Sequence, residues 1–165
     1  MRRLALFAAL LLGALAMLTT GRAAAIGSQP VVYVMRHLNT PAGQSDPDLL
    51  PEGEAAAAAL AGRFGAERPA AIYITDFRRS RQSVAPLAAR LGLTPILYDP
   101  RDTPGLVARI RAEHGPVLVV GHSNTVPDIV AALGGPRPAP LAHEDFGDLW
   151  RVAPDGATIH MRIVP

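Results

Sequence analysis

The chain has 165 residues, 49% of them hydrophobic, with 16 basic against 14 acidic side chains. This length suits a single domain with its own core, and the near balance of charge argues against a nucleic-acid-binding surface. The chain has no cysteine, which excludes disulfides, a thiolate nucleophile and a lipid-modified cysteine.

The first 25 residues have the three parts of a secretory signal peptide. Arg2-Arg3 is the positive start, Leu4 to Leu18 is an apolar run, and Ala23-Ala24-Ala25 is a small-residue cleavage site. The run is shorter than the ~20 residues that span a membrane, which favours cleavage over an uncleaved anchor. We therefore expect Sec-type export to the periplasm or beyond, a mature domain over 26–165, and no membrane association after cleavage. Three basic residues lie in the leader, so 13 remain against 14 acidic ones and the mature net charge is near −1.

The mature region alternates short apolar runs with Ala- and Leu-rich stretches. We predict, in chain order, strand 31–35, helix 52–64, strand 71–74, helix 79–91, strand 95–98, helix 103–113, strand 117–120 and helix 126–133. This alternation predicts a mostly parallel sheet with helices on both faces, a three-layer α/β/α fold. Pro86 predicts a kink or a new start within its helix. Two strands, about 147–153 and 157–164, flank Ala153-Pro154-Asp155-Gly156 and predict a C-terminal hairpin.

Three of the predicted strands end abruptly at polar clusters. Arg36-His37 follows the first strand, Gly121-His122-Ser123-Asn124 follows the last parallel one, and arginines at 78, 79 and 81 follow the strand over 71–74. Ligands of parallel α/β sheets bind at the carboxyl ends of the strands, so these clusters are expected to meet there. Arginine supplies a planar, permanently charged fork suited to phosphate or carboxylate.

These segments, in this order, resemble the histidine phosphatase superfamily, the phosphoglycerate-mutase-like proteins. Arg36-His37-Leu38 stands where the family has Arg-His-Gly, and Gly121-His122 where it has its late Gly-His. Thr75 to Ser83 stands where the family has Ser-Pro-Leu-x-Arg-Ala-x-Gln-Thr, with Arg79 at the catalytic arginine. Leu49 to Gly53 resembles the family's Leu-Thr-x-x-Gly helix start. The similarity runs from Val31 to about Val152 and implies a mixed sheet with one antiparallel strand.

The resemblance implies a metal-independent phosphomonoester hydrolase without a cofactor, acting on a small phosphorylated substrate. His37 would be the nucleophile that forms a phosphohistidine, and His122 a charged donor to a phosphoryl oxygen. Arg36 and Arg79 would stabilise the charge on the other phosphoryl oxygens. Further candidate substrate-binding donors, for which turn or cap formation is an equal alternative, are Thr40, Ser123 and Asn124.

A general acid is needed to protonate the leaving group. The family uses a Glu or Asp whose position varies, and the candidates here are Asp99, Asp102 and Asp128. Asp102 is the preferred one because it lies between a strand end and the next helix, although it could instead cap that helix. His114, His143 and His160 belong to no catalytic pattern and are interpreted as surface or structural residues.

Other functions remain open. The departure at Leu38-Asn39 and the unassigned acid are consistent with an anion-binding protein that has lost turnover. A small open architecture favours a phosphohistidine-protein phosphatase, whereas export disfavours it. A zinc site built from two histidines and an aspartate is disfavoured, since no close-spaced ligand motif exists and arginines would repel the ion. Few residues separate Ser83 from His122, which leaves little chain for the lid that a mutase needs.

Overall fold

A computed structural model describes residues 29–164 of the chain. The predicted signal peptide lies outside these residues, as does the start of the predicted mature domain. Over the range from 29 to 164, no helix combines the length and the apolar character needed to cross a membrane.

The described elements follow the predicted order closely. The strands are β1 (Val32–Arg36), β2 (Ala71–Ile74), β3 (Ile96–Leu97), β4 (Val117–Gly121), β5 (Asp148–Val152) and β6 (Thr158–Arg162). The helices are α1 (Pro51–Arg63), α2 (Arg78–Leu91), α3 (Thr103–Arg111) and α4 (Val126–Ala132). β3 is shorter than predicted because it pairs on one side only, as an edge strand next to β2.

All six strands form one sheet in the order β3-β2-β4-β1-β5-β6. β1 pairs in parallel with β4, and β4 in parallel with β2, so their carboxyl ends share one edge. β5 runs antiparallel to both β1 and β6. This mixed sheet confirms the predicted fold class, including the antiparallel strand and the C-terminal hairpin.

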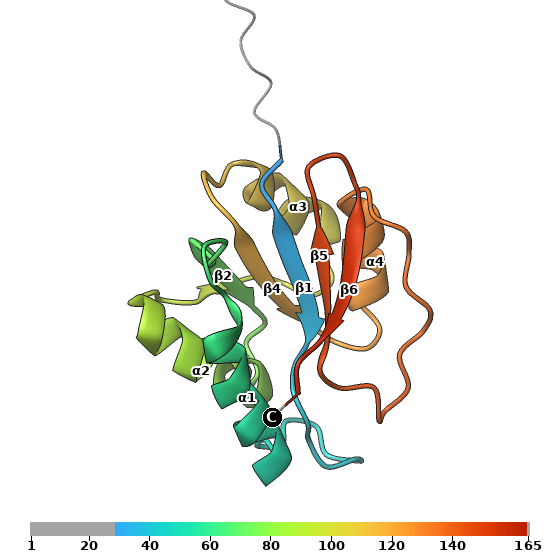
Figure 1. Cartoon of the computed structure of the whole chain (residues 1–165). Coiled ribbons are helices and arrows are strands. Elements are labelled where there is room, and N and C mark those ends of the chain that lie inside the picture. The colour runs from blue at the N-terminus through green and yellow to red at the C-terminus, as the bar shows by residue number, and fades with distance from the viewer. Residues whose placement is uncertain (1–28, 165) are drawn as a thin grey trace, which may run out of the picture.

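Helices cover both faces of the sheet (Figure 1). On one face, Leu60 of α1 and Leu87 of α2 pack with the inward side chains of the strands, such as Met35. On the other face, Ile110 of α3 and Ile129 of α4 pack against the alternate strand residues. Strand side chains point alternately to the two faces, so apolar residues at nearly every strand position are what two buried faces require.

α2 is one continuous helix across Pro86, so the proline marks no new start. Pro86 is exposed on this helix, and its missing N–H leaves the carbonyl four residues earlier without its helical hydrogen-bond donor. At the other helix of this layer, Gly53 allows α1 to approach the loop after β1. A Cβ on Gly53 would lie 2.6 Å from the carbonyl oxygen of Asn39, which excludes larger residues there. The turn following β1 is thereby held against the start of α1.

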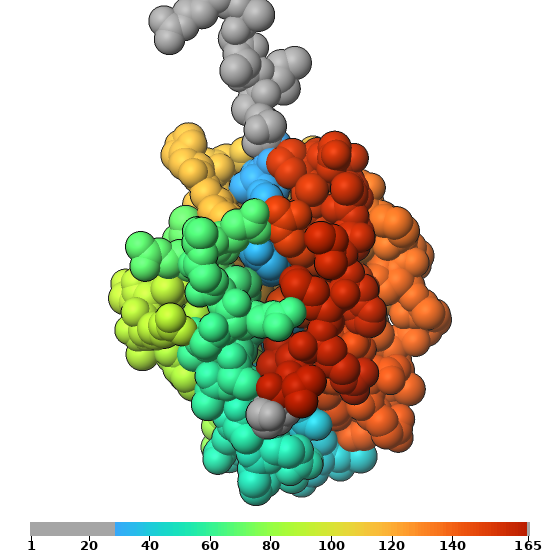
Figure 2. Space-filling view, viewed as in Figure 1, coloured from blue at the N-terminus to red at the C-terminus, as the bar shows by residue number. Residues whose placement is uncertain are grey.

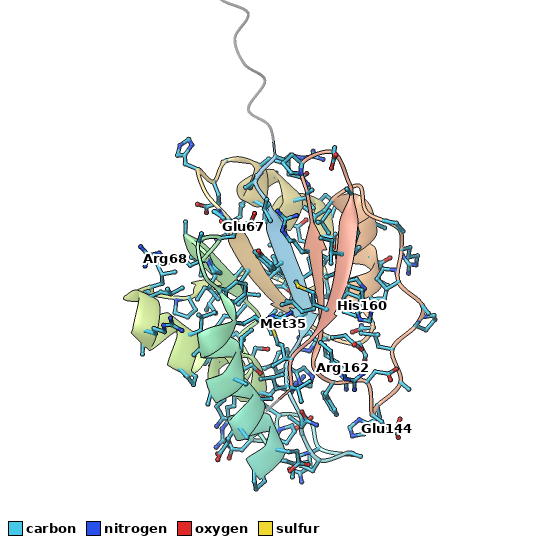
Figure 3. All side chains as sticks on the ribbon, viewed as in Figure 1. Met35, Glu67, Arg68, Glu144, His160 and Arg162 are labelled. Carbon is cyan, nitrogen blue, oxygen red and sulfur yellow. The ribbon has the colours of Figure 1, made fainter. Side chains whose placement is uncertain are left out.

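The C-terminal hairpin packs beside the α1 and α2 layer and leaves little of β1 visible between them (Figure 2). Glu67 lies in the loop before β2, near the amino end of β1, and its hydrogen bonds connect this loop to the hairpin. It accepts a 2.7 Å hydrogen bond from the Tyr33 hydroxyl and two 2.8 Å bonds from Arg151 on β5. Figure 3 shows Glu67 far from Glu144, which lies in the loop preceding β5, at the opposite end of the molecule.

Candidate active site

The two predicted histidines meet at the carboxyl edge of the sheet. Arg36 pairs with Gly121 in the parallel ladder between β1 and β4, and the next residue on each strand is a histidine. The ring centroids of His37 and His122 are 5.4 Å apart, with an interplanar angle of 61°. The ladder continues one step further, since the His37 N–H donates to the Gly121 carbonyl at 3.0 Å.

His37 is held in one neutral tautomer. Its Nδ1 lies 2.9 Å from the carbonyl oxygen of Leu38, which can only accept, so Nδ1 carries the proton. Burial, and then the charge of Arg36, lowers the pKa of His37 to about 3. Its Nε2 therefore holds a lone pair at neutral pH and bonds to no protein atom. An imidazole fixed in this way is a nucleophile.

His122 has a different environment. Its Nε2 lies 2.9 Å from the Thr75 hydroxyl, and its ring edge packs against Phe77 at a centroid distance of 5.2 Å. Burial, followed by the charges of Arg79 and Arg36, lowers the pKa of His122 to about 4. In the site without a phosphoryl group, burial and the two arginines therefore favour a neutral His122, whereas a charged His122 beside a bound phosphoryl oxygen stays a prediction.

Arg79, at the start of α2, points into the site. Its guanidinium lies over the Phe77 ring at 4.2 Å and donates to the Ser45 carbonyl at 2.8 Å. It also pairs with Asp46 at 3.2 Å. These contacts hold the side chain between the loop after β1 and the start of α2, where only 13% of its surface is exposed.

Arg36 has contacts that local sequence does not reveal. Its Nη1 donates to the carbonyls of Ala142 and His143 at 2.7 and 3.1 Å, and its guanidinium lies 4.1 Å from the centre of the Phe146 ring. Its Nε is the one fully buried side-chain nitrogen or oxygen without a hydrogen-bond partner in the described part of the chain. Arg36 thus joins the end of β1 to the loop that leads into β5.

Two open cavities lie beside these residues and share Arg79. The larger, about 250 Å³, is lined by Phe77, Arg79, Pro100, Arg101, His122, Asn124 and Thr125. The smaller, about 150 Å³, is lined by Arg36, His37, Thr40, Pro41, Gly43, Gln44, Pro47, Arg79 and His143. These linings contain arginines, histidines and neutral groups but no carboxylate, so the site is suited to an anion.

The structure divides the candidate substrate-binding residues. Thr40 is buried and lines the smaller cavity, and Asn124 lines the larger one. Ser123 lines neither. The departure at Leu38 is accommodated because its side chain is fully buried in the core, and its N–H donates to the Ser83 hydroxyl at 2.8 Å.

The expected position of Asp102 over the pocket is wrong. Asp102 is the N-cap of α3 and accepts a 2.9 Å hydrogen bond from the Gly105 N–H, and it lines neither cavity. Asp102 therefore has the alternative role named for it from the sequence, the cap of the helix that follows. The other two candidates are also occupied elsewhere, because Asp99 pairs with Arg101 and Asp128 with Arg137, in exposed ion pairs.

Several residues of the site are not revealed by the sequence patterns. Phe77 and Phe146 support the two arginines, and their signal is an aromatic residue close to each cluster. His143, interpreted from the sequence as surface or structural, lines the smaller cavity. Thr125 accepts a 2.9 Å bond from the His122 N–H. Within residues 29–164, no three His, Cys, Asp or Glu side chains gather as metal ligands would.

A comparison with protein families supports the resemblance. Residues 32–101 match the family model described as "Histidine phosphatase superfamily (branch 1)". The matched segment contains Arg36, His37 and Arg79, whereas His122 lies beyond it. A search of curated protein sequences gave no match.

Solved structures show the same fold. TTHB049 from Thermus thermophilus is 19% identical, with 82% of this chain and 99% of that chain covered and a TM-score of 0.52. A mycobacterial glucosyl-3-phosphoglycerate phosphatase with inorganic phosphate is 18% identical, with coverages of 82% and 96% and a TM-score of 0.60. The same phosphatase with VO3 is 17% identical, with coverages of 75% and 92% and a TM-score of 0.63.

Proposed function

We propose that this protein hydrolyses small phosphomonoesters through a phosphohistidine on His37. The premise is that the chain belongs to the histidine phosphatase superfamily. The observation that carries the proposal is the tautomer of His37. Its Nδ1 donates to the Leu38 carbonyl, so the lone pair of Nε2 is directed into a cavity that two arginines line. A nucleophile beside fixed positive charge is the arrangement that phosphoryl transfer needs.

The reaction has two steps. In the first, the Nε2 lone pair of His37 forms a bond to phosphorus as the ester P–O bond breaks, and the leaving oxygen departs with that electron pair. The Leu38 carbonyl, bonded to Nδ1–H, stabilises the positive charge that develops on the ring. In the second, water attacks phosphorus, the P–N bond breaks, and its electron pair returns to Nε2. Arg36 and Arg79 stabilise the phosphoryl oxygens in both steps.

Assay of the purified protein with an aryl phosphate tests this proposal. His37→Ala should abolish both turnover and acid-labile labelling of the protein by radioactive phosphate. Arg79→Ala should lower kcat/KM by roughly 10²-fold or more, as removal of a preorganised charge-stabilising donor does. His114→Ala, at a position that lines neither active-site cavity, is the matched control. Turnover and labelling that survive in His37→Ala would refute the role of His37.

A second candidate follows from the carboxylate-free cavities. Without a positioned acid, the site favours substrates whose leaving group departs unaided, such as a phosphohistidine in a partner protein or an acyl phosphate. A series of phosphate esters with leaving groups of increasing pKa separates the two. A steep fall in kcat toward alkyl esters favours this candidate, whereas a shallow dependence favours general phosphomonoesters. An anion-binding protein without turnover would bind vanadate and hydrolyse none of them.

The proposal includes metal independence and export. No ligand cluster exists among the described residues, and the arginines around the histidines would oppose a cation, so EDTA should leave activity unchanged. Activity lost to EDTA and restored by zinc would overturn the metal-free mechanism. Export to the periplasm or beyond rests on the leader sequence alone.

A further inference from the structure

Thr75, the residue immediately after β2, makes two hydrogen bonds through one buried hydroxyl. Its Oγ1 lies 2.9 Å from Nε2 of His122 and 2.8 Å from the Oγ of Ser80 on α2. Thr75 and Ser80 are both completely buried. Ser80 makes no other side-chain hydrogen bond in the described part of the chain. Ser80, Thr75 and His122 therefore form a short linear series of hydrogen bonds that ends at a histidine of the candidate active site.

The number of protons available decides which atom donates in each of these two hydrogen bonds. If His122 carries its proton on Nδ1, Ser80 donates to Thr75 and Thr75 donates to Nε2, and both hydroxyl protons are used. If Nε2 carries the proton, Nε2 donates to Thr75 and Thr75 donates to Ser80. The hydroxyl proton of Ser80 then has no acceptor. A buried donor without a partner is costly, so the first arrangement is favoured.

We propose that Thr75, supported by Ser80, is a positioning residue that holds His122 as a neutral imidazole protonated on Nδ1. The Nδ1–H is then a hydrogen-bond donor facing the cavity. Nδ1 bonds to no protein atom and is not among the fully buried unpartnered atoms, so it is accessible from the larger cavity that His122 lines. The donor role rests on the proposed function, since the phosphoryl group would be the acceptor.

The same series of hydrogen bonds opposes a charged His122. An imidazolium donates from both nitrogens, which forces the second arrangement and leaves the Ser80 proton unpaired. The neutral ring also avoids adding a third positive charge beside Arg36 and Arg79. The two histidines thus both carry their proton on Nδ1 but present opposite groups to the site. His37 bonds a carbonyl and presents a lone pair, whereas His122 bonds a hydroxyl and presents an N–H.

Ser80 is one of the positions at which this protein departs from the motif that residues 75–83 resemble, since the motif has Ala there. Alanine has no hydroxyl and would leave Thr75 with the histidine as its one partner. Here Ser80 donates to Thr75, and a hydroxyl that accepts one hydrogen bond becomes a stronger donor in the next. Ser80 therefore strengthens the bond from Thr75 to His122.

Nuclear magnetic resonance of the unmodified protein tests the tautomer directly. The chain has five histidines, and with ¹⁵N-labelled histidine the signals of His122 are identified by their loss in His122→Gln. We expect a protonated Nδ1 and an unprotonated Nε2 at pH 7. A protonated Nε2, alone or as part of an imidazolium, would overturn the proposal. This result does not depend on activity, so it remains decisive even if the protein hydrolyses no phosphate ester.

Variants then test whether Thr75 is the cause. Thr75→Val keeps the shape and removes the hydroxyl, and it should produce a mixture of the two tautomers and lower kcat on an aryl phosphate about tenfold. Thr75→Ser should restore both, and Thr158→Val, in β6, controls for the same change elsewhere. A Thr75→Val protein that keeps the pure Nδ1–H tautomer would refute the role of Thr75. If that variant does not fold, Thr75→Ser must still show the wild-type tautomer, or the role is refuted.

Discussion

Arg36→Met should destabilise the protein as well as inactivate it. Methionine has a shorter, uncharged side chain, so it loses the contact of the guanidinium with the Phe146 ring and cannot donate to the carbonyls of Ala142 and His143. Those two bonds, at 2.7 and 3.1 Å, join the end of β1 to a loop more than 100 residues later. Their loss releases the segment that leads into β5.

The size of the effect follows from these contacts. A hydrogen bond from a charged donor contributes roughly 1.5–3 kcal/mol, and the released carbonyls regain part of this by binding water because their loop is exposed. The net loss should be about 3 kcal/mol, which for a domain of this size lowers Tm by roughly 10 °C. Arg79→Met removes a bond and an ion pair at the exposed loop over 45–46, so its loss should be about 1 kcal/mol.

Urea unfolding followed by tryptophan fluorescence measures both variants. The chain has one tryptophan, Trp150, which is 7% exposed and lies on β5, the strand that the released loop enters. Its emission therefore reports on the region that Arg36 holds. Arg79→Met is the matched control, because it removes the other arginine of the candidate site by the same substitution. Equal unfolding free energies for the two variants would refute the structural role of Arg36.

Three further predictions concern other parts of the molecule. The free energy of unfolding should fall as the pH is lowered from about 6.5 to 4, because histidines in the unfolded chain bind protons that His37 and His122 in the folded protein do not. In urea titrations at several pH values, a His37→Gln variant should show a shallower dependence of this free energy on pH. An unchanged dependence would contradict the lowered pKa of His37, to about 3. Asp102→Asn should slow alkyl and aryl phosphates equally and by little, since Asn still caps α3; selective slowing of alkyl esters would restore Asp102 as the acid. Protein purified from the periplasm should begin near Ile26 by mass analysis, and a chain that begins at Met1 would contradict cleavage.

The fold is predictable because its signals are local. Short apolar runs that end at polar clusters predict β1, β2 and β4. The alternation of strands with helices predicts a parallel sheet, in which the carboxyl ends of these strands meet. The convergence of Arg36, His37, Arg79 and His122 follows from that topology. The roles of these residues in catalysis remain predictions for the assays described above.

The remaining features depend on contacts between distant segments. Arg36 meets the loop over 142–145 because β5 packs beside β1, which no pattern near Arg36 reveals. The charge of His122 depends on burial and on two arginines from other elements, so its own sequence neighbours do not indicate it. Asp102 has the spacing of a pocket residue, but a free helix N-terminus beside it offers a closer hydrogen-bond donor.

The parallel pairing of β1 with β4 has a consequence for protein engineering. The separation of His37 and His122 is set by main-chain hydrogen bonds and one register, Arg36 opposite Gly121, and not by the conformation of a long loop. A designer could therefore obtain the same histidine pair on any parallel sheet by ending two neighbouring strands in that register. A slip of one residue would turn one imidazole to the opposite face, so strand registration is the first property such a design has to secure.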